Sequence, residues 1–145
     1  MIFSLPIQLE EVIRLDKYEN NNIKKIYLIK DSNEPSQLLQ KVSVQGYKDE
    51  IIMFLHIDIK KDYIKKLEIV SEHETEHYGG HISEEWFKNR FMGKDTSLQL
   101  ETVKMSAKKE SEVVAVTGAT ISSDAVVKGV NIVLKNYRDI KVKIK

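Results

Sequence analysis

Apolar and polar residues mostly alternate along four short segments between residues 23 and 70, and this pattern predicts four β-strands. The segments are residues 23–30, a stretch marked by Val42, Val44 and Tyr47, residues 51–59 and residues 63–70. Short polar stretches at residues 20–22, 31–35 and 60–62 are typical of turns. Because consecutive strands joined by short turns run in opposite directions, we expect an antiparallel meander.

Helical spacing of apolar residues predicts three helices. The first covers residues 4–15, where one face carries Leu5, Leu9, Val12 and Ile13. Ser83 is suited to cap a second, short helix that ends at Phe91. The third starts near Ser122 or Ser123, either of which is suited to cap it, and its apolar face carries Val126, Val130, Val133, Leu134 and Tyr137.

Two further strands are expected between the second and third helices. Leu98, Leu100 and Val103 mark one, and the apolar residues 113–116 form the other after a polar loop. The chain is therefore predicted to have an α+β fold, in which a curved antiparallel sheet is covered by helices. The C-terminal helix would follow directly on a short loop at residues 117–120.

Composition excludes several classes of function. The chain has 145 residues, and 23 basic against 22 acidic side chains give a net charge of +1, so nothing favours nucleic-acid binding. Cysteine is absent, which excludes disulfides, thiolate metal sites, iron–sulfur clusters and thiol catalysis. No stretch approaches the roughly 20 apolar residues that span a bilayer, so we expect no membrane insertion by this chain as given.

The sequence Thr117-Gly118-Ala119-Thr120 joins the last predicted strand to the C-terminal helix. Gly118 and Ala119 have almost no side chain, so a bulky group can approach the backbone closely. Thr120 presents a hydroxyl where the unpaired N–H groups and the positive dipole end of a helix favour a phosphate. We interpret the segment as a small-residue platform with a hydroxyl and an anion site.

The segment from His73 to His77 matches H-E-x-x-H, in which two histidines on one helical turn bind zinc and the glutamate activates water. A zinc peptidase built on His73, Glu74 and His77 needs this motif inside a stable helix. Gly79 and Gly80 would end such a helix within a turn. We therefore expect no metal site, and we rank this interpretation third.

The run from Val116 to Ser123 resembles the S/T-G-A-T flavinylation motif of FMN-binding domains, which occur in the Rnf and sodium-pumping NADH:quinone reductase complexes. A second match follows in the family's order, because Glu74-Thr75, Gly79-Gly80 and Trp86-Phe87 resemble its E-T-P-G-L-G segment and the aromatic pair downstream. The resemblance covers residues 42–138 of one domain, residues 1–145, to which residues 1–40 add the N-terminal helix and first strand.

The resemblance implies that FMN is joined to Thr120 through a phosphoester, and that the chain carries electrons between protein partners rather than converting a small substrate. It also implies redox partners and a separate Mg-dependent flavin transferase that takes the FMN from FAD. The cofactor-binding residues implied beside Thr120 are Thr117, Gly118, Ala119, Ile121, Ser122, Ser123, Glu74, Thr75, Tyr78, Gly79, Gly80, Trp86 and Lys94.

The implied residues would have distinct roles around the flavin. Glu74 and Thr75 would hydrogen-bond its edges, and Tyr78 and Trp86 would offer aromatic surfaces. The hydroxyls of Ser122 and Ser123 would face its phosphate. Lys94 would offset negative charge on the reduced ring or the phosphate.

One departure from the family pattern favours an alternative function. Val114 stands where the family usually has an aspartate, three residues before the motif. The alternative is a module that binds FMN without a covalent bond, or an assembly module without redox turnover of its own. The family also suggests a location on the extracytoplasmic face of the cytoplasmic membrane, with the cytoplasm as the alternative.

Overall fold

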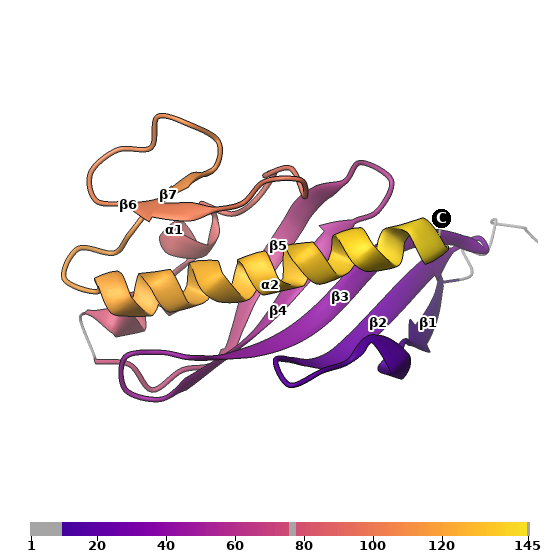
Figure 1. The fold of residues 1–145 in the computed structure, drawn as a ribbon, viewed down its shortest axis with the longest axis horizontal. Coiled ribbons are helices and arrows are strands. Elements are labelled where there is room, and N and C mark those ends of the chain that lie inside the picture. The colour runs from indigo at the N-terminus through magenta and orange to yellow at the C-terminus, as the bar shows by residue number, and fades with distance from the viewer. Residues whose placement is uncertain (1–9, 76–77, 145) are drawn as a thin grey trace, which may run out of the picture.

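The computed structural model describes residues 10–75 and 78–144, and its main layer is a five-stranded antiparallel sheet (Figure 1). The strands follow one another in chain order across the sheet, which confirms the predicted meander. They are β1 Glu10–Arg14, β2 Ile23–Asp31, β3 Glu34–Gln45, β4 Glu50–Asp58 and β5 Tyr63–Ser71.

The turn between β2 and β3 is tighter than the sequence indicated. Ser32 and Asn33 both adopt positive φ, at 52° and 67°, and Asp31 already pairs with Glu34. Two consecutive left-handed residues match the twist of a two-residue hairpin, and asparagine tolerates that conformation. The polar stretch predicted as a turn at residues 31–35 therefore contains a two-residue turn and the start of a long strand.

The prediction of an N-terminal helix over residues 4–15 is wrong for its described part. Residues 10–14 form the edge strand β1, in which Val12 pairs with Ile29 and Ile13 with Leu28. Pairing with β1 satisfies backbone groups along β2 that would otherwise form an open edge. Residues 4–9 lie outside the described residues, and a short 3₁₀ helix, η1 Asp16–Tyr18, follows the strand.

The helix α2, Thr120–Ile144, lies across one face of the sheet (Figure 1). A buried polar side chain fixes its position, because Gln40 on β3 donates to the Val133 carbonyl over 3.3 Å and accepts from Asn136 over 2.7 Å. The fold is α+β, as predicted. Among the described residues, no helix is both long enough and apolar enough to cross a membrane.

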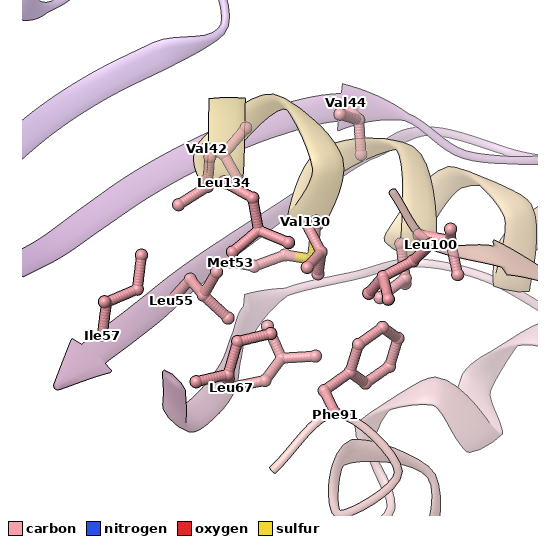
Figure 2. Close-up of a cluster of buried hydrophobic side chains, with 14 of the residues drawn as sticks. Val42, Val44, Met53, Leu55, Ile57, Leu67, Phe91, Leu100, Val130 and Leu134 are labelled. Carbon is pink, nitrogen blue, oxygen red and sulfur yellow. The ribbon is translucent and has the colours of Figure 1, made fainter. Parts of the chain in front are cut away.

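The hydrophobic core fills the space between the sheet and α2. Figure 2 shows part of it, with side chains from β3, β4 and β5 meeting those of α2. Met53, Leu55 and Ile57 on β4 are buried, as are Val130 and Leu134 on α2. The start of α2 is thus the first turn of a helix that the core holds along most of its length.

Smaller elements gather near the N-terminal end of α2 (Figure 1). They are the 3₁₀ helix η2 Gly79–Ser83, the helix α1 Glu85–Lys88, and the strands β6 Glu101–Val103 and β7 Glu112–Val114. The two strands pair in parallel, and β7 ends two residues earlier than the predicted segment.

The predicted cap of the helix near residue 86 is wrong. Its N-cap is Glu84, which makes no side-chain capping bond, and α1 ends at Lys88 rather than at Phe91. The hydroxyl of Ser83 instead donates to Glu72 Oε2 over 3.1 Å, which ties η2 to the end of β5. The Ser83 hydroxyl therefore makes a tertiary hydrogen bond instead of capping the helix as the local sequence pattern had suggested.

Candidate functional site

The β7–α2 loop, residues 115–119, is held in a single shape by its own hydrogen bonds. Gly118 has φ +77°, a left-handed conformation that glycine adopts without strain. The Ala119 N–H donates to the Val116 carbonyl over 2.9 Å. The Ser123 hydroxyl accepts from the Val116 N–H and donates to the Ala119 carbonyl, both over 2.9 Å. Thr120 follows as an exposed residue at the very start of α2.

The predicted caps of α2 are therefore corrected. The helix begins at Thr120, and both Ser122 and Ser123 lie inside its first turn with their side chains buried. The Ser123 hydroxyl serves the preceding loop, and the Ser122 hydroxyl donates to Glu74 Oε1 over 2.7 Å. An anion at Thr120 would meet backbone N–H groups of the first turn, which lack partners within a helix, rather than these two hydroxyls.

A cavity of about 530 Å³ opens beside Thr120. Three separate segments line it: the loop after β3, the segment after β5, and the end of the β7–α2 loop together with the start of α2. Its lining residues are Tyr47, Thr75, Tyr78, Gly79, Gly118, Ala119, Thr120, Ile121 and Ser122. This volume is typical of a site for a small organic ligand or cofactor. All of these residues except Tyr47 were predicted from the sequence, and the fold brings them together from two segments that are far apart in the chain.

The remaining residue, Tyr47, was missed. The sequence placed it at the end of the second strand, but β3 ends at Gln45 and Tyr47 lies in the following loop with its side chain exposed. The sequence did contain one indication that the strand ends before Tyr47. Gly46 directly precedes it, and a glycine near a strand end often marks a break in the pairing.

Glycine is required by packing at two places around the cavity. A Cβ on Gly118 would lie 3.1 Å from Tyr78 Cδ1, so the tyrosine ring rests against the bare backbone. A Cβ on Gly79 would lie 2.5 Å from Ser122 Oγ and 2.7 Å from Glu74 Cβ. Both glycines therefore allow segments of the wall to approach more closely than any side chain would permit.

Glu74 occupies a different place from the one predicted. Its carboxylate is buried and accepts from the backbone N–H groups of Tyr47, over 2.6 Å, and Lys48, over 3.0 Å, as well as from Ser122. Glu74 is absent from the residues that line the cavity. It therefore joins the three walls to one another behind the cavity surface, and its carboxylate oxygens already have partners.

The environment of Glu74 keeps it ionised. Burial acts to raise the pKa of its carboxyl group, but the hydrogen bonds from Ser122 and from backbone N–H groups of residues 47–49 outweigh this effect and lower the pKa below its usual range. A buried carboxylate with this many donors is a stable negative charge at neutral pH.

Trp86 lines a second cavity, of about 350 Å³, which includes residues 115–117 of the β7–α2 loop and shares no lining residue with the cavity beside Thr120. Its lining includes Thr117 and Arg90 but not Thr120. The Arg90 guanidinium lies over the Trp86 ring, 5.0 Å from its centroid, and the ring of His81 lies 5.8 Å away. The predicted residues Trp86 and Thr117 are thus close to the β7–α2 loop, but they face a different hollow from Tyr78 and Thr75.

Lys94 and Gly80 are not among the residues that line either cavity. The Lys94 ammonium donates to the Glu110 carbonyl and, over 3.5 Å, to the Glu112 carbonyl, and burial lowers its pKa. Lys94 thus fastens the loop before β7. The Gly80 N–H donates to the Thr75 carbonyl over 3.0 Å, which closes the turn into η2.

The segment that matched a zinc motif has no helix in its described part. Residues 72–75 have no regular secondary structure, and the Glu74 carboxylate accepts from backbone N–H groups and from Ser122. His77 lies outside the described residues. Among the residues that are described, no three His, Cys, Asp or Glu side chains cluster as metal ligands would.

Comparison with known proteins identifies a curated relative, as well as solved structures with a similar fold. The relative is a subunit of the Na⁺-translocating ferredoxin:NAD⁺ oxidoreductase complex of Acetobacterium woodii, which is 31% identical over 117 residues. These residues cover 79% of this chain and 56% of the relative. The chain therefore spans little more than half the length of the curated relative that it matches.

Two crystal structures share the fold. A subunit of the Na⁺-translocating NADH-quinone reductase from Parabacteroides distasonis superimposes with a TM-score of 0.67 and 21% identity, covering 81% of this chain and 62% of that one. NqrC from Shewanella oneidensis gives a TM-score of 0.68 and 15% identity, covering 83% of this chain and 60% of that one. At this level of identity the match shows a common fold.

The family model for the FMN-binding domain matches residues 46–135, which include every wall of the cavity beside Thr120. Together with the Acetobacterium woodii relative, this match confirms FMN as the predicted cofactor. The chain therefore belongs to the FMN-binding domain family.

Proposed function

We propose that this chain carries FMN on Thr120 through a phosphoester bond and acts as an electron carrier between protein partners. The observation that carries the proposal is the position of the Thr120 hydroxyl. Thr120 is exposed, it begins a helix that the core holds in place, and it lines a cavity of cofactor size. An enzyme that attaches FMN must reach the threonine hydroxyl, and the exposure of Thr120 makes this possible.

The residues around Thr120 fit the parts of FMN. Gly118 and Ala119 leave the backbone bare beside the cavity, which gives a ribityl chain room to pass. The first N–H groups of α2 and the positive end of its dipole suit a phosphate. When bound, FMN supplies the electron-transfer chemistry, and the residues of the chain hold, orient and shield it.

Attachment would require a separate flavin transferase that uses FAD and Mg²⁺. The Thr120 oxygen forms a bond to the phosphorus of the FMN half of FAD, the pyrophosphate bond breaks, AMP leaves, and the hydroxyl proton passes to a base of the transferase. The exposed residues Thr117, Gly118, Thr120 and Ile121 are available for recognition by such an enzyme.

A second candidate is a module that binds FMN reversibly or serves assembly. Val114 favours it, because the family usually has an aspartate at this position. Val114 is fixed in the structure by its carbonyl, which accepts from Arg90. Titration of the protein with free FMN, in the absence of any transferase, distinguishes the candidates: a saturable, reversible change in flavin fluorescence would favour this second function.

Partners, location and domain organisation follow from the same proposal. By analogy with the Acetobacterium woodii relative, the partners would be other redox subunits of a membrane complex. On the family resemblance, the proposed site of action is the extracytoplasmic face, with the cytoplasm as alternative. Residues 1–145 would form one domain. Support for this comes from β1, which pairs within the same sheet that α2 covers.

Co-expression with a flavin transferase tests the proposal. Wild-type protein should show flavin fluorescence on a denaturing gel and the mass increase of one esterified FMN, and Thr120→Val should show neither. Thr102→Val is a matched control, because its hydroxyl bonds Asp124 near the same end of α2 but lies outside the cavity beside Thr120. Equal flavin content in wild type and Thr120→Val would remove Thr120 from this role.

A further inference from the structure

Tyr47 lines the cavity beside Thr120, and its side chain is 63% exposed while its backbone is tied down by hydrogen bonds. Its N–H donates to Glu74 Oε1 over 2.6 Å, and the neighbouring Gly46 N–H donates to the Asp49 carbonyl over 2.8 Å. A Cβ on Gly46 would lie only 2.5 Å from Glu74 Oε1, so the backbone of this loop is packed directly against the carboxylate. The exposed ring therefore stands on a fixed backbone.

A second tyrosine lines the same cavity from a different segment. Tyr78 is 54% exposed, and its ring rests against Gly118, close to Thr120 in the chain. Ile121, 57% exposed, adds an aliphatic surface. Exposed aromatic and aliphatic side chains that converge on one cavity are suited to a large planar aromatic ligand, whose faces gain contact area without hydrogen bonds.

The cavity beside Trp86 is less suited to a planar ring. It is smaller, it lacks Thr120, and the Trp86 face is already covered by the Arg90 guanidinium at 5.0 Å. A ring tethered to Thr120 has Tyr47 and Tyr78 within the hollow that Thr120 itself lines.

We propose that Tyr47 contacts the isoalloxazine ring of the bound FMN, and that Glu74 positions it by holding its backbone N–H. This inference rests on the proposed function. It assigns the ring to the cavity lined by Tyr47 and Tyr78, and not to the cavity lined by Trp86. Glu74 acts in it as a positioning residue through its bond to the Tyr47 loop, without touching the flavin.

Flavin fluorescence tests this contact, because a phenol ring in contact with an excited flavin donates an electron and quenches its emission, whereas a phenyl or aliphatic group does not. The protein is flavinylated by co-expression, flavin content is measured by mass, and emission is compared per bound flavin. Because Tyr78 is a second phenol in the same cavity, all comparisons are made in a Tyr78→Phe background, in which Tyr47→Leu and Tyr47→Phe should both raise emission several-fold. Tyr47→Phe, which keeps the ring, should retain the visible circular dichroism of the Tyr78→Phe parent, and Tyr47→Leu should lose it.

Two control variants complete the experiment. Trp86→Leu removes the aromatic residue of the other cavity and should change emission little. Tyr27→Leu removes a tyrosine from β2, among neighbours that do not line the cavity, and should leave both signals unchanged. Unchanged emission and dichroism in flavin-loaded Tyr47→Leu would overturn the inference, as would an emission increase seen with Trp86→Leu instead.

The outcome separates the inference from the proposed function. If wild type carries covalent flavin but emission in the Tyr78→Phe background does not change when Tyr47 is replaced, only the contact is contradicted. If wild type carries no covalent flavin, the proposed function fails, and the same variants are titrated with free FMN. If the emission of bound FMN is quenched in the Tyr78→Phe background and rises when Tyr47 is replaced, the contact is supported independently of the covalent bond. If the quenching does not depend on Tyr47, or if free FMN does not bind, the contact is overturned.

Discussion

The hydroxyl of Ser122, in the first turn of α2, donates to Oε1 of Glu74, which lies 48 residues earlier in the chain, over 2.7 Å. Both side chains are buried. Because Glu74 also accepts from the Tyr47 and Lys48 N–H groups, this single carboxylate connects the start of the helix to two loops. The shape of the cavity therefore depends on a hydrogen-bond network outside the sheet.

Removal of the Ser122 hydroxyl should destabilise the protein. Ser122→Ala deletes a hydrogen bond to a buried charge, so the free energy of unfolding should fall by about 2 kcal/mol. Urea unfolding followed by circular dichroism measures this. Ser106→Ala, at an exposed position in the loop before β7, should stay within about 0.5 kcal/mol of wild type. An unchanged stability of Ser122→Ala would contradict the network.

Glu74 should make stability depend on pH in the acid range. Its pKa is lower in the folded protein than in the unfolded chain, where glutamate has a pKa of about 4.3. Its contribution is therefore complete above that unfolded value and is lost as the pH falls through the folded pKa. Glu74→Gln lacks this titration. Unfolding free energies measured at several pH values should show the gap between wild type and variant narrowing in acid, and a constant gap would refute the assignment.

Two adjacent glycines should respond differently to the same substitution. A Cβ at Gly79 would lie 2.5 Å from Ser122 Oγ, whereas at Gly80 the nearest atom is the Thr75 carbonyl oxygen at 3.5 Å. Gly79→Ala should therefore lower the free energy of unfolding by about 1 to 3 kcal/mol through overpacking. Gly80→Ala is the matched control and should leave stability unchanged or slightly raised. Thermal unfolding of both variants decides the matter, and equal effects would count against close packing at Gly79.

Gly129 and Met53 should be energetically coupled. A Cβ on Gly129 would lie 2.2 Å from Met53 Cε and 3.3 Å from Val44 Cγ1. In wild type, Gly129→Ala gains about 1 kcal/mol of helix propensity but forces the buried Met53 to move, so we expect a net loss. In a Met53→Val background the obstructing methyl is gone, and the same substitution should stabilise. A double-mutant cycle from denaturant unfolding measures the coupling, and additive effects would show that the two residues act independently.

The sequence predicted elements whose pattern is local, and it failed where a distant partner decided the outcome. The strands β2, β4 and β5 follow from alternation, and the buried face of α2 follows from the spacing of Val126, Val130 and Val133. For β3 the pattern marked only the end near Val42 and Val44, whereas the strand begins at Glu34. Residues 10–14 have an equally good helical pattern, yet they form β1 because β2 offers an edge to pair with. The spacing of apolar residues within residues 10–14 does not reveal that β2 has an edge with which they can pair.

In the candidate site, too, the sequence predicted local features and missed those that depend on distant partners. Gly118, Ala119 and Thr120 were predicted from the motif as cofactor-binding residues, and all three line the cavity. The partners of Ser122, Ser123 and Glu74 were not predicted, because each hydrogen bond depends on how loops pack together. The sequence assigned these polar side chains to flavin contacts, and in the structure their hydrogen bonds hold the walls of the cavity together. Tyr47 is the reverse case, because the sequence assigned it to a strand and not to the site, yet it lines the cavity.

Thr120 begins a helix whose side chains are packed in the core as far along as Tyr137 and Ile140, so the proposed attachment point has no hinge of its own. With a flavin on Thr120, the ring can change its distance to a partner only through rotation about single bonds of the ribityl tether or through travel of the whole domain. The reach of the electron carrier would then be set by the few bonds of its cofactor and by whatever anchors the domain.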